Sequence, residues 1–332
     1  MLGPWRLTAI VKAHQQNCEV WAAEPATDAC PESWHDGAAA VPHVVLKLKR
    51  NEGRGFAEAV LGGELTDADL ECVDLADVFQ SDVRALSSRA LATSANPWYA
   101  YGVTRELTWS AMRRFTCSLA DVARDAAAAA WLRDGGWRAV LRGVLRSLHV
   151  PHARGFVHRD LRQDNVMLLL APRADGTPWW SATDVRWSGD VACVDAVAAD
   201  WGLARPVAPT GYAAHPDNLV AMQVTGARLG VPHTARHDVG ALLWSTGLAM
   251  QGRRHGQEPP PFNLQVLHAA ALQELRCPAD AEAAMLWIDA TLDWARRRAM
   301  MPPALAPIID ALVALAPQPQ AKATQALVDA CG

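Results

Sequence analysis

Short apolar runs separated by polar turns dominate the first part of the chain. The runs Leu7 to Val11, Glu19 to Ala23 and His43 to Lys49 are short and rich in alternating or branched apolar residues, which predicts three β-strands. In the third run, Lys47 and Lys49 fall on one face and Leu46 and Leu48 on the other. Leu107 to Ala111 predicts a further strand. This part of the chain is therefore expected to be rich in β-structure.

The apolar pattern becomes helical further along the chain. Trp137 to His149 has apolar residues at helical spacing, which predicts a helix that packs in a core through Val140, Leu141, Val144, Leu145 and Leu148. Val166 to Leu170 then predicts a strand, and Phe262 to Leu315 is mostly amphipathic helix. Residues 51–78 have a helical pattern of their own and interrupt the β-rich part, while 171–190 are rich in Trp, Pro, Asp and Gly and predict a surface excursion. The fold class expected is α+β.

Composition limits the partners of this protein. Of its 332 residues, 51% are apolar and 20% are charged, as in a globular protein, and the net charge is -4. No nucleic-acid or membrane partner is expected from this charge. Seven scattered cysteines without metal-ligand spacing indicate a reducing compartment, and no secretory pattern or long apolar run is present, so the cytosol or the nucleus is expected.

The segment from Phe156 to Leu168 has the strongest chemical signal. It places an acid, a cation and an amide at fixed steps between an apolar helix and an apolar strand. Asp160 could accept the proton of an attacking hydroxyl, Arg162 could neutralise a migrating phosphoryl group, and Asn165 could bind a divalent metal ion through its amide oxygen. These residue types together suit phosphoryl transfer.

The segment resembles the catalytic loop of protein kinases, H-R-D-L-x-x-x-N, and every fixed letter is present from His158 to Asn165. Further segments resemble the same family in the same order, namely Val44-Val45-Leu46-Lys47 (V-A-I-K), Ser118-Leu119-Ala120-Asp121 (a helix start), Asp200-Trp201-Gly202 (D-F-G) and Arg236 to Trp244 (a helix start whose Asp238 would cap the helix and bond back to the catalytic loop). The resemblance implies a two-lobed kinase-like fold. It divides the chain into a small β-rich lobe over 1–111, a hinge and a mainly helical lobe over 112–315, and a tail over 316–332.

The resemblance also assigns residues to a nucleotide and a metal. It implies that Lys47 binds the phosphates of ATP, that Asp82 holds this lysine, with Glu71 and Glu64 as the other acids in reach, and that Met112 lies in the hinge beside the adenine. Asn165 and Asp200 would hold Mg²⁺, the second cofactor. In the segment after Gly202, Thr210 and Tyr212 are the hydroxyl residues, and we expect this segment to be ordered with little or no phosphorylation.

Two departures from the family keep other functions open. The turn from Lys12 to Cys18 has no glycine, where kinases have a glycine-rich phosphate loop, and Asp82 stands where they have glutamate. The expected function is transfer of the γ-phosphate of ATP to a hydroxyl of a protein substrate. Serine or threonine is favoured on general grounds and not by any particular residue of this chain. The alternatives are a pseudokinase scaffold and a small-molecule phosphotransferase. The sequence makes no prediction of the oligomeric state.

Overall fold

The structure is a computed structural model, and it describes residues 5–13, 18–25, 44–50, 98–103, 107–153, 156–158, 161–200, 205–206, 235–254 and 301–314. The chain divides into two compact units, Met1–Arg114 and Phe115–Gly332. Both sheets and helices are present, and the sheets are antiparallel, so the α+β class is confirmed. Within the residues listed above, no helix is long and apolar enough to cross a membrane. The insertion at 51–78 and the tail from 316 lie outside the described residues.

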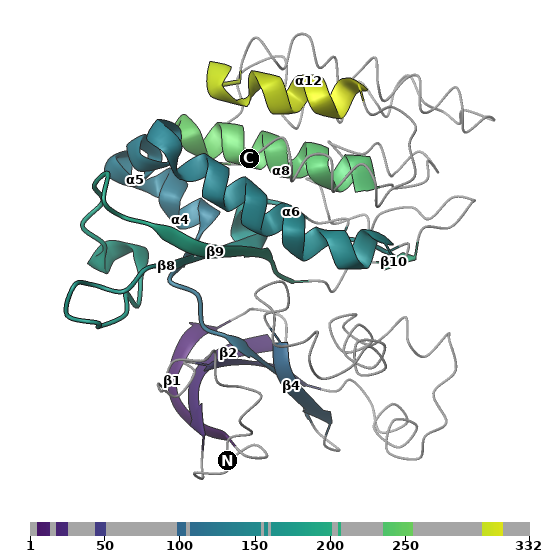
Figure 1. Ribbon diagram of the computed structural model, residues 1–332. Coiled ribbons are helices and arrows are strands. Elements are labelled where there is room, and N and C mark those ends of the chain that lie inside the picture. Colours follow the sequence, from purple (N-terminus) through teal and green to yellow (C-terminus); the bar gives the residue numbers. More distant parts are fainter. Residues whose placement is uncertain are drawn as a thin grey trace. The chain divides into compact units, whose positions relative to one another are not determined.

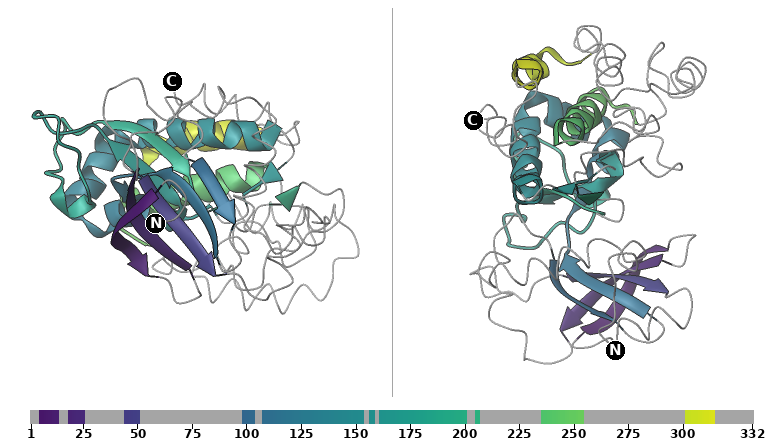
Figure 2. Two further views of the ribbon diagram at one scale, coloured as in Figure 1. Left: turned by 90° about the horizontal axis from the view of Figure 1, so that it is seen from below. Right: turned by 90° about the vertical axis from the view of Figure 1, so that its right-hand side faces the viewer.

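The described part of the first unit is a five-stranded sheet with the strand order β1-β2-β3-β5-β4. All neighbouring strands are antiparallel, and Figure 2 shows that the sheet is twisted. The four strands that the sequence analysis predicts are present; three of them extend beyond the predicted bounds, and the third is shifted by one residue. The strands of the sheet are β1 Trp5–Ala13, β2 Cys18–Pro25, β3 Val44–Arg50, β4 Trp98–Val103 and β5 Leu107–Arg113.

One face of this sheet forms the core of the first unit. Trp5, Val44 and Leu46 are almost completely buried there, and Leu48 packs with them. Lys47 is half-buried on the opposite face of β3, as the alternation predicted. The hydrophobic cluster therefore fixes which side of the sheet carries Lys47.

Met112 and Arg113 are the last two residues of β5, where they pair with Val45 and Val44 of β3. The sequence predicted that this strand ends at Ala111. Met112 also pairs with Trp98 of β4. The strand continues because its backbone has a partner on both sides, a contact that the local sequence does not reveal.

The second unit contains helices and a three-stranded sheet, in the order β6-β8-β9. Its helices are α4 Leu119–Arg124, α5 Ala126–Trp131, α6 Trp137–Ala153, α8 Ala235–Met250 and α12 Ala306–Ala314. A π-helical turn, Leu132–Gly136, joins α5 to α6, and 3-10 turns lie at Gln163–Asn165, Ala182–Asp184 and Pro303–Leu305. Its strands are β6 Cys117–Ser118, β7 Phe156–Val157, β8 Val166–Leu170, β9 Cys193–Ala198 and β10 Arg205–Pro206.

The helix α6 forms much of the core of the second unit. The predicted apolar stripe is confirmed, since each of its side chains is fully buried, namely Val140, Leu141, Val144, Leu145 and Leu148. The helix packs against β9, where the backbone of Gly143 approaches that of Ala196. In Figure 1, α8 lies between α6 and α12, and it contacts both of them. Because α6 and α12 both pack against it, α8 is a central helix of the second unit.

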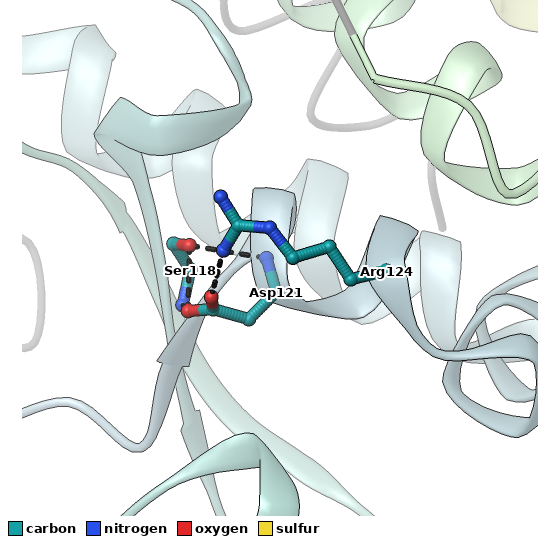
Figure 3. A network of polar contacts seen from close by, with 3 residues as sticks. All are labelled: Ser118, Asp121 and Arg124. Atoms are coloured by element: carbon teal, nitrogen blue, oxygen red, sulfur yellow. Dashed lines mark hydrogen bonds and ion pairs between the residues drawn. The ribbon is translucent and has the colours of Figure 1, made fainter.

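The start of α4 is fixed by a capping box, as the resemblance at Ser118 to Asp121 implied. The Ser118 hydroxyl accepts a hydrogen bond from the Asp121 amide at 3.2 Å, and the Asp121 carboxylate accepts one from the Ser118 amide at 2.9 Å (Figure 3). Arg124 adds an ion pair with Asp121 at 2.6 Å. These contacts satisfy amides at the start of the helix that have no partner within it.

The excursion between β8 and β9 lies on the surface, as predicted. Residues 172–177 are exposed, and the loop is closed at its base by a hydrogen bond from the Ala171 amide to the Ala192 carbonyl at 2.8 Å. Trp187 packs against Trp131 of α5 with ring centroids 5.0 Å apart. The excursion is thus attached to the helical part of the unit.

Candidate functional site

The open end of the β8–β9 hairpin brings Asn165 and Asp200 together. In the ladder, Val166 pairs with Ala198, and beyond it the Ala199 amide donates a hydrogen bond to the Asn165 carbonyl at 2.8 Å. Asp200 is the next residue, so two residues separated by 35 positions in sequence are neighbours in space. Asn165 is buried and Asp200 is exposed. Their side chains supply an amide and a carboxylate oxygen, the donor types that Mg²⁺ prefers.

Asp200 has an uncommon backbone conformation. Its φ is 61°, in the left-handed region, and it is the one described non-glycine residue with a positive φ. Such a conformation costs roughly 1–3 kcal/mol and is found most often at functional sites. The residue before it is held from two sides, because Ala199 donates its amide to Asn165 and accepts a hydrogen bond from His158.

His158 joins three parts of this site. Its side chain is fully buried, and Nε2 lies 2.9 Å from the Ala199 carbonyl oxygen. A carbonyl only accepts, so Nε2 carries the proton. The His158 amide donates to the Asp238 carboxylate at 2.6 Å, so this residue connects the loop to both α8 and the end of β9.

Asp238 binds the loop from inside α8. The sequence predicted this contact, and the bond from the His158 amide confirms it. The expected capping role was wrong, because α8 begins at Ala235 and Asp238 lies within its first turn. The same carboxylate oxygen is 2.9 Å from Nε2 of His152, and both side chains are almost completely buried.

His152 is a site residue that sequence reasoning missed. The apolar pattern predicted a helix that ends at His149, but α6 continues to Ala153 with Pro151 inside it, and His152 makes the contact with Asp238. His152 lies six positions before His158, whereas His149 lies nine positions before it. This shorter spacing was a signal that could have identified His152.

Gln163 was also missed. Its side chain is 1% exposed, and its amide nitrogen lies 3.0 Å from the carbonyl oxygens of both Ser245 and Arg253. A buried polar side chain at this position has no counterpart in the motif letters, which leave it undefined. The loop is therefore bound to α8 at two places, through His158 and through Gln163.

The Arg162 side chain is partly exposed at the surface of the second unit. Its Nε is 3.9 Å from a carboxylate oxygen of Asp164, and both side chains are about two-fifths exposed (42% and 41%). An ion pair this long and this exposed contributes little to stability. Arg162 is thus not fixed by Asp164.

The other predicted site residues are distributed as follows. Asp160 and Asp82 lie outside the described residues, as do Glu64, Glu71, Thr210 and Tyr212. Lys47 and Met112 belong to the first unit, while Arg162, Asn165 and Asp200 belong to the second. Within the described ranges, no three or more His, Cys, Asp or Glu side chains group as a metal site. Asparagine, the residue type at position 165, is not one of these four types.

Two cysteines of the small sheet are not activated nucleophiles. Burial raises the pKa of Cys193 to about 12, with the Asp195 carboxylate as a further cause. Burial, and after it the charge of Asp121, also raises the pKa of Cys117 far above its ordinary value. Because the thiolate is the reactive form, neither thiol is prepared for nucleophilic attack at neutral pH.

Comparison with known proteins adds no relative. Neither the models of known protein families nor the curated proteins include a match to this chain. The functional interpretation therefore depends on the residues and contacts described above.

Proposed function

We propose that this protein is an ATP-dependent protein kinase with the two-lobed kinase fold, and that it transfers the γ-phosphate of ATP to a serine or threonine hydroxyl of a protein substrate. The observation that carries the proposal is the arrangement around the loop 158–165. His158 and Gln163 are bound to α8 on either side of Asp160 in sequence, and Asn165 lies beside Asp200. The attachment of this loop to α8 and the neighbouring positions of Asn165 and Asp200 support the proposal.

Each residue has a role that follows from its chemistry. Asp160 orients the acceptor hydroxyl and takes its proton, and Arg162 steadies the charge on the phosphoryl group. Asn165 and Asp200 supply oxygen ligands for Mg²⁺, which suits their donor types. When bound, this ion would neutralise negative charge on the nucleotide phosphates.

The first unit would bind the nucleotide. Lys47, half-buried on β3, binds phosphate oxygens, Asp82 pairs with it, and Met112 contributes to the adenine site. In this proposal the β-rich lobe covers 1–111 and the helical lobe 112–315. The proposed compartment is the cytosol or the nucleus.

The test is radiolabelled ATP turnover with Mg²⁺, comparing the wild type with Asp160→Asn. Removal of a general base lowers rates by roughly 10²–10⁴-fold, so the variant should lose that much activity. Asp164→Asn is the matched control, because it makes the same change four residues away on a half-exposed side chain, and it should stay within a few-fold of the wild type. An Asp160→Asn variant as active as the control would refute the assignment.

A pseudokinase is the second candidate, and a specific sequence feature favours it. The segment from Lys12 to Cys18 lacks glycine, and a side chain at every position would hinder the close approach of its backbone to phosphates. In that case the wild type would bind nucleotide without turnover.

A small-molecule phosphotransferase is the alternative with respect to the acceptor. The Asp238 contact to the loop, made from the helix that resembles a protein-kinase signature, favours a protein acceptor.

A further inference from the structure

Gln163 is a polar side chain buried at the centre of the second unit. Its amide nitrogen has two protons, and it lies 3.0 Å from each of two main-chain carbonyl oxygens, those of Ser245 and Arg253. These partners are 82 and 90 residues away in sequence. Two acceptors require two donors, so both protons are used and the orientation of the amide is determined.

The two acceptors belong to a rigid part of the molecule, the C-terminal end of α8. Gly252 there has a φ of 67°, and its amide donates to the Ala249 carbonyl while the Arg253 amide donates to that of Leu248. These are the two bonds of a Schellman motif, in which glycine adopts the left-handed conformation. Arg133 donates a further hydrogen bond to the Met250 carbonyl at 3.0 Å. The helix end is therefore fixed independently of Gln163.

Gln163 is also the first residue of the 3-10 turn Gln163–Asn165. The Asn165 amide closes this turn on the Arg162 carbonyl at 2.9 Å, and the Asn165 carbonyl binds Ala199. Any displacement of Gln163 would move the turn and with it the side chain of Asn165.

We propose that Gln163 is a positioning residue, which sets the orientation of the Asn165 amide as a metal ligand by anchoring its turn to the C-terminal end of α8. This inference rests on the proposed function. Groups that orient a metal ligand typically change metal affinity or activity by about 10–100-fold when they are removed.

The decisive variant is Gln163→Met, which preserves the volume of the side chain and removes both donors. Thr246→Val is the matched control, because it removes one buried hydrogen bond of α8, from the Thr246 hydroxyl to the Leu242 carbonyl at 2.8 Å, that does not involve the loop. Gln163→Asn keeps the amide but is one methylene too short, and it replaces the first variant if that one does not fold.

Two measurements on the full chain separate positioning from stability. The first is the affinity for Mn²⁺, used as the probe, in the presence of a non-hydrolysable ATP analogue. The second is amide hydrogen exchange of the peptide that contains Asn165, without metal or nucleotide. We expect Gln163→Met to weaken Mn²⁺ binding by about 10–100-fold and to speed exchange at Asn165 roughly 10-fold, as for the loss of one or two hydrogen bonds. Thr246→Val should leave both unchanged.

The outcomes distinguish this inference from the proposed function. Equal Mn²⁺ affinity and equal exchange in Gln163→Met and Thr246→Val would overturn the positioning role, whatever the turnover of the wild type. A wild type that binds Mn²⁺ in a Gln163-dependent way but transfers no phosphate would remove the proposed kinase activity and support the positioning role. A wild type that does not bind Mn²⁺ would overturn both.

Discussion

Asp238 is a buried carboxylate in the first turn of α8. One of its carboxylate oxygens accepts hydrogen bonds from the His158 amide and from the His152 imidazole, and all three groups are buried. A buried carboxylate is stable only when donors surround it, and the donors in turn depend on the carboxylate. This single side chain therefore connects α6, α8 and the loop.

Replacing Asp238 with alanine should destabilise the protein strongly. The change leaves two buried donors without an acceptor, at about 1–3 kcal/mol each, so the free energy of unfolding should fall by about 2–6 kcal/mol. Urea denaturation measures this. Asp184→Ala removes an exposed carboxylate of the excursion and should change stability by no more than about 0.5 kcal/mol. Similar losses in both variants would contradict the role given to Asp238.

The sequence predicted residues that are defined by motif letters better than residues that are defined by long-range contacts. Asp238 was expected to bind the loop and does so. Gln163 was missed because its partners lie 82 and 90 positions away and the motif leaves its position undefined. His152 was missed because the helix was expected to end at His149. The left-handed backbone of Asp200 was not predicted, although aspartate adopts this conformation more readily than most residue types.

Among the elements, α6 and β9 approach each other closely through their backbones. A Cβ atom added to Gly143 would lie 2.7 Å from both the backbone nitrogen and the backbone oxygen of Ala196. Neither atom can move away cheaply, because β9 is bound to β8 along its length. Ser147, one turn further along α6, donates to the Val144 carbonyl and accepts from the Ala198 amide at 3.0 Å.

Gly143→Ala should therefore destabilise the protein, although alanine is the better helix former by about 1 kcal/mol. Forcing extra volume into a close contact costs about 1–3 kcal/mol, which outweighs the gain in helix propensity. Thermal or urea unfolding would show the sign. Arg146→Ala, on the exposed face of the same helix, is the control and should be nearly neutral. A more stable Gly143→Ala protein would show that α6 and β9 are not in close contact.

Elements with strong local patterns were predicted with nearly correct bounds. The strands β1, β2, β3 and β8 and the core stripe of α6 fall in this group. The pattern failed where pairing decides the outcome. Met112 extends β5 through its partners on both sides, and the two-residue strands β7 and β10 pair with each other across 48 positions, from Val157 to Arg205.

At the scale of the whole molecule, the proposed function makes ATP with Mg²⁺ a ligand of the folded protein. A ligand that binds only the folded protein stabilises it by an amount that rises with the logarithm of the ligand concentration above the dissociation constant. ATP with Mg²⁺ at a hundred times its dissociation constant should raise the free energy of unfolding by about 2.7 kcal/mol.

A thermal unfolding series tests this expectation. Removing Mg²⁺ with a chelator, or changing Asp200 to Asn, should abolish the metal-dependent part of the shift, because a carboxylate ligand is lost. Identical unfolding curves with and without ATP and Mg²⁺ would argue against both the kinase and a nucleotide-binding pseudokinase.

The α+β class followed from the sequence because the apolar period changes from two to three or four residues along the chain. The kinase fold and the metal site are predictions of motif resemblance, and two residues assigned to the candidate site, Asp160 and Asp82, lie outside the described residues. Hydrogen bonds and strand pairing support the part of this prediction that concerns the second unit, where the loop, α8 and the β8–β9 hairpin meet.

The excursion at 171–190 leaves the β8–β9 hairpin and returns to it at one point, seen at the left of Figure 1. Its base is closed by Ala171 and Ala192, and Gly176 lies in an exposed turn closed on Arg173. The entropy of closing a loop rises only slowly with its length. A reporter domain could thus be grafted at Gly176, at the end of the hairpin away from Asn165 and Asp200, which makes this position a practical handle for following the protein in cells.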